Sequence, residues 1–180
     1  MSIFKIFKRN TEKSESKSEI LTPIICEKEI DEQILKQIND IDWENFETAY
    51  GNAHRTIPNY LKSIYCEDIK IALEATHQLW CSLCHQHAYI SSASLPAYEI
   101  IRNRLIGCNE KLKVELLDIM LGFASCAKDK TDDKKYNELI SQMKIKIVKD
   151  KGIFEKYTQN QNDDIKEFAE LITEQIKNYS

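Results

Sequence analysis

The sequence predicts an all-α fold, an α-α superhelix of about three helical pairs. One segment recurs: residues 67–75 read EDIKIALEA, 163–171 read DDIKEFAEL and 110–117 read EKLKVELL. Each copy has a polar start and apolar residues at helical spacing, and each follows a second apolar helix, at 57–61, 153–157 and 95–101 respectively. Only four glycines and three prolines punctuate the chain, which disfavours a multi-strand sheet. Recurring helix pairs that bury their faces against each other are typical of solenoids.

The chain divides into a tether and one helical domain. Residues 10–19 contain no apolar side chain, so we expect a flexible N-terminal tether over 1–22 and a helical repeat domain over 23–180. Residues 1–9 contain Ile3, Phe4, Ile6 and Phe7 among three basic side chains, which is compatible with weak contact with a membrane surface.

Caps and apolar spacing predict the individual helices. Asp42 is expected to cap a short helix that contains Trp43 and Tyr50 and ends at Gly51. Ser92 or Ser94 is expected to cap the helix that carries Pro96 in its first turn. The predicted helices span residues 26–39, 42–50, 54–65, 68–87, 94–106, 109–128, 134–148, 153–157 and 163–178.

The charge is mildly acidic and unevenly distributed. The chain has 25 Lys and Arg against 29 Asp and Glu, which disfavours unaided binding to a nucleic-acid backbone. Between residues 27 and 47, eight carboxylates face two lysines. This segment is either a solvated helix face or a docking patch for a basic partner. The one concentrated basic stretch, which would favour nucleic acid instead, contains Lys144, Lys146, Lys149 and Lys151.

The sequence predicts a cytoplasmic protein with reduced cysteines. The apolar stretch at the N-terminus is too short for a secretory signal and is interrupted by Lys5, and no apolar run could span a membrane. Several of the six cysteines are expected to be small core residues.

The long helix over 68–87 suggests an alternative function. His77, Cys81 and His85 would fall at i, i+4 and i+8 on one stripe, which could bind a metal ion if another element supplied a further ligand. Cys81, Cys84 and His85 also match the attachment pattern for c-type haem, but such proteins are exported. No G-x-S-x-G elbow, P-loop, dinucleotide fingerprint or His-Glu-x-x-His motif occurs, so we expect no enzyme and no cofactor.

The stretch from Ile41 to Pro96 resembles a family of small bacterial HEAT-repeat proteins. The matching elements are Ile41-Asp42-Trp43, 49–53 (AYGNA), 57–61 (IPNYL), His85-Gln86 and 92–96 (SASLP). Such proteins usually have glycine after His-Gln, whereas this chain has His87. Many are apparent immunity proteins of polymorphic-toxin or contact-dependent growth inhibition systems. The resemblance therefore implies a HEAT-like solenoid that neutralises a cognate protein toxin by covering its active site or substrate groove. The expected toxin is basic, for example a nuclease.

Two sets of residues are the predicted partner contacts. One is the acidic segment after residue 30, and the other is the outward edge of the second helix in each pair, because a solenoid presents corresponding helices on one face. These candidates are Asp31, Glu32, Asp40, Asp42, Glu44, Glu47, Glu74, His77, Glu115, Asp118, Glu170 and Glu174.

Overall fold

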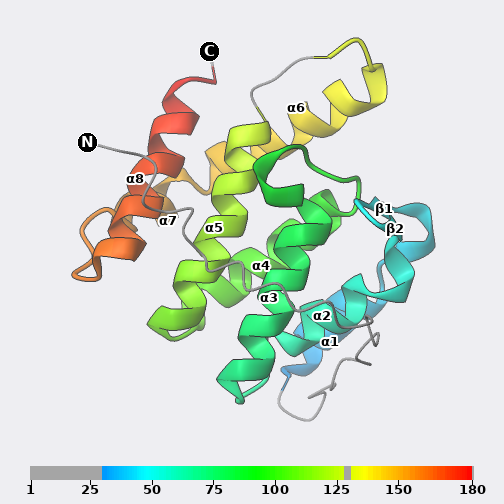
Figure 1. Ribbon diagram of the computed structural model, residues 1–180, viewed down its shortest axis with the longest axis horizontal. Coiled ribbons are helices and arrows are strands. Elements are labelled where there is room, and N and C mark those ends of the chain that lie inside the picture. The colour runs from blue at the N-terminus through cyan, green and yellow to red at the C-terminus, as the bar shows by residue number, and fades with distance from the viewer. Residues whose placement is uncertain (1–29, 128–130, 180) are drawn as a thin grey trace, which may run out of the picture.

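The prediction of an all-α fold is confirmed by the computed structural model, which describes residues 30–127 and 131–179. Within these residues the chain forms α-helices, three short 3-10 helices and one two-stranded hairpin (Figure 1). The predicted tether over 1–22 and the predicted membrane contact of 1–9 lie outside the described residues. No helix in the described ranges is long and apolar enough to cross a membrane.

Most of the helices occur as consecutive pairs along the chain. The elements are α1 (Glu32–Asn39), η3 (Trp43–Asn45), β1 (Glu47–Thr48), β2 (Gly51–Asn52), η4 (Ala53–Arg55), α2 (Ile57–Ser63), α3 (Ile69–Leu83), η5 (His85–His87), α4 (Ser94–Gly107), α5 (Glu110–Cys126), α6 (Lys134–Lys149), α7 (Lys151–Tyr157) and α8 (Asp163–Lys177).

Short polar side chains start most of the longer helices. In each case an Asp or Asn side-chain oxygen accepts hydrogen bonds from backbone amides of the first turn, which would otherwise lack partners. These N-caps are Asp31 of α1, Asp68 of α3, Asn109 of α5, Asp133 of α6 and Asn162 of α8.

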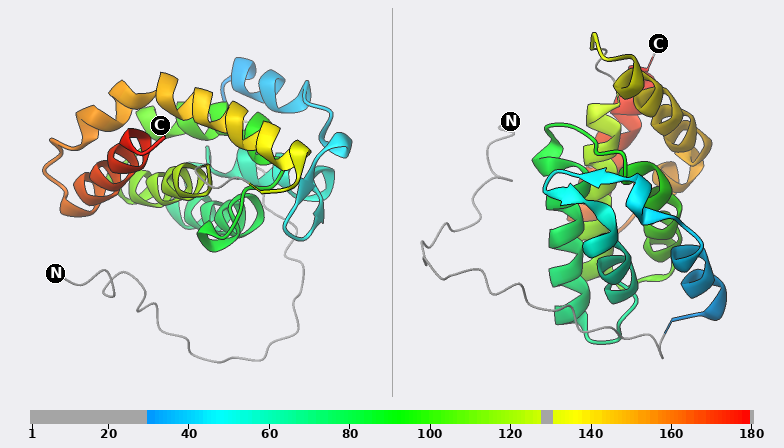
Figure 2. Two further views of the ribbon diagram at one scale, coloured as in Figure 1. Left: turned by 90° about the horizontal axis from the view of Figure 1, so that it is seen from above. Right: turned by 90° about the vertical axis from the view of Figure 1, so that its right-hand side faces the viewer.

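The three recurring segments form adjacent helices. They correspond to α3, α5 and α8, and α5 packs between the other two (Figure 1). Their preceding helices, α2, α4 and α7, each contact the following helix, while α6 is inserted between the second and third pair. Seen from above, α4, α6 and α7 lie together along one side of the row formed by α3, α5 and α8 (Figure 2). The helix pairs are therefore present, and their classification as a HEAT-like solenoid stays a prediction.

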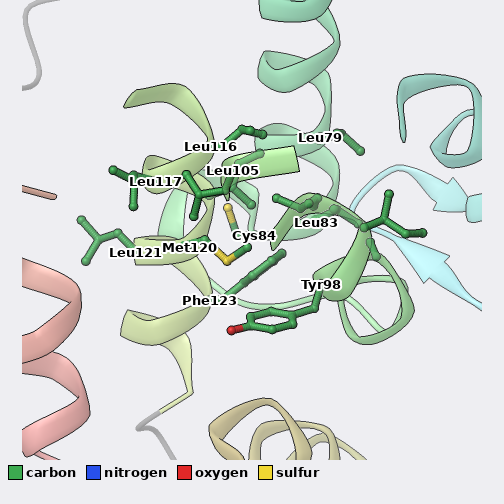
Figure 3. Close-up of a cluster of buried hydrophobic side chains, with 14 of the residues drawn as sticks. Leu79, Leu83, Cys84, Tyr98, Leu105, Leu116, Leu117, Met120, Leu121 and Phe123 are labelled. Carbon is green, nitrogen blue, oxygen red and sulfur yellow. The ribbon is translucent and has the colours of Figure 1, made fainter. Parts of the chain in front are cut away.

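The core is continuous from the first helices to the last. Its centre joins α3, α4 and α5, where Leu83 and Cys84 approach Met120 and Phe123, with the ring of Tyr98 beside Phe123 (Figure 3). Leu83, Cys84, Met120 and Phe123 are fully buried. Such a dense centre fixes how α3 and α5 are oriented and thereby positions the surface features that follow them.

The predicted helix over 42–50 is wrong. After the 3-10 helix η3 the chain extends into the β1–β2 hairpin, and Gly51 adopts φ +114° at the first residue of β2 rather than at a helix end. Asp42 makes no cap, because its carboxylate accepts a hydrogen bond from Asn45 Nδ2 at 2.7 Å. Tyr50 is 67% exposed instead of packing in the core.

The cysteines are partly as expected. Cys84, Cys108 and Cys126 are buried free thiols, and Cys81 is half-buried. Cys66, by contrast, is disulfide-bonded, so the expectation that every cysteine is reduced is wrong for this residue.

Candidate protein-binding surface

Part of the predicted acidic segment converges on one cleft. Asp40, Asp42 and Glu44 line a hollow of about 450 Å³ between the end of α1 and the start of α2. Its other lining residues mix apolar and polar groups: Ile38, Asn39, Ile41, Trp43, His54 and Pro58. The cleft therefore combines three carboxylates with apolar wall, which suits the long aliphatic stem and charged head of Lys or Arg.

Hydrogen bonds fix the walls of this cleft. The buried Trp43 donates from Nε1 to the carbonyl of Ile38 at 2.8 Å, which holds η3 against the end of α1. On the opposite side, Asn52 Nδ2 donates to the carbonyl of Glu44 at 2.8 Å. Because both contacts use groups other than the carboxylates of Asp40 and Glu44, the acidic side chains remain at the surface.

The rest of the acidic segment is exposed but less concentrated. Asp31 caps α1, Glu32 lies in the first turn of α1, and Glu47 lies on β1. Asp40 forms an ion pair with Lys36 one turn earlier, so one of its neighbours partly neutralises it. Residues 31 to 47 thus form an acidic edge that contains Asp31, Glu32, Asp40, Asp42, Glu44 and Glu47 and a single lysine.

The β1–β2 hairpin connects this acidic edge to the helical body. The amide of Glu47 donates to Ser92 Oγ at 2.8 Å, and its carbonyl accepts from the amide of Ala93 at 3.1 Å. The amide of Ala49 donates to the carbonyl of Ser82 at 3.0 Å. The hairpin is therefore attached to both the end of α3 and the start of α4.

The predicted long helix over 68–87 ends early, at Leu83. The following 3-10 helix η5 contains two residues in the left-handed region, His85 at φ 37° and His87 at φ 64°. Non-glycine residues adopt this conformation rarely and at a cost of about 1 to 2 kcal/mol. His87 stands where the family that residues 41–96 resemble usually has glycine. Its positive φ shows that the backbone at this position has a conformation typical of glycine.

Contacts with α5 hold η5 in this conformation. The Nε2 of His87 lies 3.0 Å from Asp118 Oδ1 and 3.0 Å from the Asp118 carbonyl. Gly122 admits the turn, because a Cβ there would lie 2.7 Å from both Cys84 Sγ and His87 Cδ2. Burial raises the pKa of the Cys84 thiol well above its usual range, which keeps it neutral beneath the turn.

Aromatic rings gather around η5, a cluster that the sequence analysis missed. The His85 ring lies between Tyr50 of the hairpin and Tyr89, with ring centroids 6.0 Å and 5.4 Å away. Trp80 contacts the rings of His77 and His87. Two buried ring nitrogens, His85 Nδ1 and Trp80 Nε1, have no hydrogen-bond partner among the described residues. The sequence signal that could have placed Tyr50 here is the following Gly-Asn, which is typical of a turn.

The predicted contact residues on the second helix of each pair are only partly brought together. On α3 and α5, His77 and Asp118 belong to the same group of contacts through Trp80 and His87. Asp118 is used to hold the turn, and Glu115 is half-buried nearby in sequence on α5.

The other members of this set make contacts within their own helices. Glu74 on α3 accepts from Gln78 Nε2 at 2.9 Å. On α8, Glu170 lies 3.9 Å from Lys166 and Glu174 is exposed.

The predicted metal stripe does not form. His77 Nε2 and Cys81 Sγ are 3.8 Å apart on α3, but His85 leaves the helical stripe because its positive φ ends the helix. Within the described ranges, no group of three or more His, Cys, Asp or Glu side chains could hold a metal ion. Cys84 is fully buried, with its thiol directed to the carbonyl of Trp80, so it is not presented to a haem.

The basic stretch near the end of α6 is largely paired. Lys146 donates to Glu99 at 2.6 Å, Lys151 lies 3.4 Å from Glu155, and the Lys144 ammonium lies over the Tyr179 ring. The ion pairs of Lys146 and Lys151 reduce the net positive charge that a nucleic-acid backbone would require.

Comparisons with protein-family models, curated proteins and solved structures found no match to this chain.

Proposed function

We propose that this protein is a binding module that recognises a basic protein through its acidic edge, residues 31–47. The observation that carries the proposal is one cleft of about 450 Å³, which Asp40, Asp42 and Glu44 line together with apolar side chains. A charged side chain that enters such a cleft gains both electrostatic attraction and apolar contact. A wrong, acidic partner would be repelled by the same groups.

The β1–β2 hairpin would extend this interface beyond the cleft. It carries the acidic Glu47 and the exposed Tyr50, whose ring contacts His85. Exposed aromatic side chains supply a large contact area at low entropic cost and are frequent among residues that dominate binding energy. Carboxylates would thus guide the encounter, and the aromatic rings at the hairpin would supply the apolar anchor.

The resemblance to immunity proteins specifies the partner further. We infer a cognate toxin with a basic active site or substrate groove, for example a nuclease, that this protein inactivates by occlusion. Occlusion requires a preformed surface and no reacting group. This agrees with a cleft whose walls are already fixed by hydrogen bonds of Trp43 and Asn52.

The first experiment is native mass spectrometry of the protein isolated gently from its own cells. A one-to-one complex with a basic polypeptide would name the partner, and that partner would then be purified for affinity measurements. Recovery of the protein alone would contradict the proposal.

A pair of matched variants then tests the acidic edge. We expect Asp42→Lys with Glu44→Lys to weaken partner binding at least tenfold, and to lower the association rate most at low salt. The control is Asp132→Lys with Glu167→Lys, which makes the same charge change at two exposed positions elsewhere. Equal loss in both pairs would show a general charge effect rather than recognition at the edge.

A further inference from the structure

A second cleft lies between α4 and α6 and shares no residue with the acidic one. Its volume is about 310 Å³, large enough for a small organic ligand. Its lining residues are Tyr98, Glu99, Arg102, Gln142, Ile145, Lys146, Lys149 and Asp150. Unlike the acidic edge, it contains three cations against two carboxylates.

Both carboxylates of this cleft already have donors from the protein. Glu99 accepts from Lys146 Nζ at 2.6 Å, and this hydrogen bond lowers the pKa of Glu99. Asp150 accepts from the hydroxyl of the buried Tyr98 at 3.1 Å. The negative charges of the cleft are therefore largely compensated internally.

The donors, by contrast, are in excess. Arg102 Nε lies 3.4 Å from Asp150 Oδ2, close enough for attraction between charges but without the geometry of a hydrogen bond. This nitrogen is buried and has no hydrogen-bond partner in residues 30–127 or 131–179. Because this nitrogen is covered, a ligand can reach Arg102 only through the exposed part of its side chain, which is 26% exposed. Lys149 and Gln142 add further donors at the opening.

An apolar residue stands beside these donors. Ile145 lines the cleft on α6 and is 69% exposed. A ligand with only a charged group would leave this side chain in water, whereas an organic acid could cover it. The lining thus pairs a cationic end with an apolar wall.

We propose that the α4–α6 cleft binds the oxyanion of a small organic ligand, a carboxylate or phosphate, through Arg102 and Lys149, with Ile145 against its apolar part. Arginine suits this role because its planar fork matches two oxygens of such an anion. The cationic excess of one favours a singly charged group, so carboxylate is the expected member of this class.

The test is a titration of the whole ¹⁵N-labelled protein followed by NMR, because the Nε–H group of Arg102 gives its own signal. The probes are sodium butyrate, sodium acetate and inorganic phosphate, each at an ionic strength held constant with sodium chloride. We expect saturable shifts of Arg102 Nε–H and of the Ile145 amide, with butyrate binding more tightly than acetate because it reaches Ile145. Tighter binding of phosphate would assign the site to phosphate-bearing ligands. Shifts that never saturate, or that chloride reproduces, would overturn the proposal.

A matched pair of α6 variants separates a specific site from general charge. Lys149→Gln removes a cation at the cleft, and Lys135→Gln removes one from the exposed first turn of the same helix. Both positions are exposed, so neither change should prevent folding. We expect about tenfold weaker binding for Lys149→Gln and no change for Lys135→Gln. The same affinity in both variants would remove Lys149 from the site and refute the assignment.

Discussion

The imidazole Nε2 of His87 lies 3.0 Å from the carboxylate Oδ1 of Asp118 and equally close to the backbone carbonyl of that residue. Both side chains are mostly buried, and the contact joins the turn after α3 to the middle of α5. It offsets the unfavourable left-handed backbone of His87 and so keeps the aromatic cluster around η5 in place.

Substitution at this position should separate backbone strain from side-chain contact. We expect His87→Gly to be more stable than His87→Ala by about 1 kcal/mol, because only glycine adopts a φ of 64° without strain. Both should be less stable than the parent protein, since both lose the contact with Asp118. Urea unfolding measures the two differences. Equal stability of the glycine and alanine variants would mean that the turn relaxes when the imidazole is removed.

The close approach at Gly122 gives a second prediction. Gly122→Ala should lower the free energy of unfolding by about 1 to 3 kcal/mol, because the new methyl group would meet Cys84 and His87 at 2.7 Å. The control is Gly152→Ala in α7, where an added Cβ has nothing within 4 Å. There the better helix propensity of alanine should be neutral or stabilising by up to about 1 kcal/mol. Thermal unfolding should show a lower Tm for Gly122→Ala and an unchanged or higher Tm for Gly152→Ala.

Two serines test the value of a buried hydrogen bond. Ser94 Oγ donates to the carbonyl of Leu83 at 2.7 Å in the core, and Ser141 Oγ donates to the carbonyl of Asn137 at 2.8 Å on the surface. Ser94→Ala should cost about 0.5 to 1.5 kcal/mol because it removes a buried hydrogen bond, while the Leu83 carbonyl keeps its bond from the amide of Ser91. Ser141→Ala should change stability by less than about 0.5 kcal/mol, since water replaces the lost donor. Chemical denaturation would contradict this reasoning if the two costs were the same.

Buried tyrosines predict a loss of stability at alkaline pH. Burial raises the pKa of Tyr65, Tyr98 and Tyr179 above the ordinary value of about 10. Below that pH the hydroxyls are protonated in both states. Above it the unfolded chain loses protons that the folded chain keeps, so the free energy of unfolding falls as pH rises.

The contribution of one of these tyrosines can be measured. Tyr98→Phe should make this fall shallower, although it also loses the hydrogen bond to Asp150 at neutral pH. The slope of the parent protein is the reference. Urea titrations between neutral pH and the alkaline limb measure both slopes.

Local signals predicted most of the helices. The apolar spacing and the Asp or Asn before the first turn located α3, α5, α6 and α8 to within a few residues, because such caps satisfy amides that have no other partner. The pairing of α3, α5 and α8 was also predictable, since their sequences repeat.

The hairpin and η5 were not predictable by the same rules. In both places a long-range contact determines the backbone: Ser92 holds Glu47, and Asp118 holds His87. The prediction that Ser92 or Ser94 caps α4 is wrong for a related reason. In the part of the chain that the structure describes, no side chain caps this helix, and the Ser94 hydroxyl donates to the carbonyl of Leu83 across the loop. The charge pattern predicted an acidic segment but no cleft, because the walls of the cleft depend on the indole of Trp43 reaching the carbonyl of Ile38.

The burial of Cys84 under η5 provides a natural reporter of motion in this protein. A thiol reagent can reach Cys81 on the half-exposed face of α3, but it reaches Cys84 only after the segment of His85 to His87 lifts away from Gly122. The rate at which mass spectrometry detects labelling at Cys84 therefore measures how often this segment opens, without any mutation or attached probe. If a partner binds the neighbouring Tyr50, the opening rate should decrease. The labelling rate of the Cys84 thiol would then report the binding.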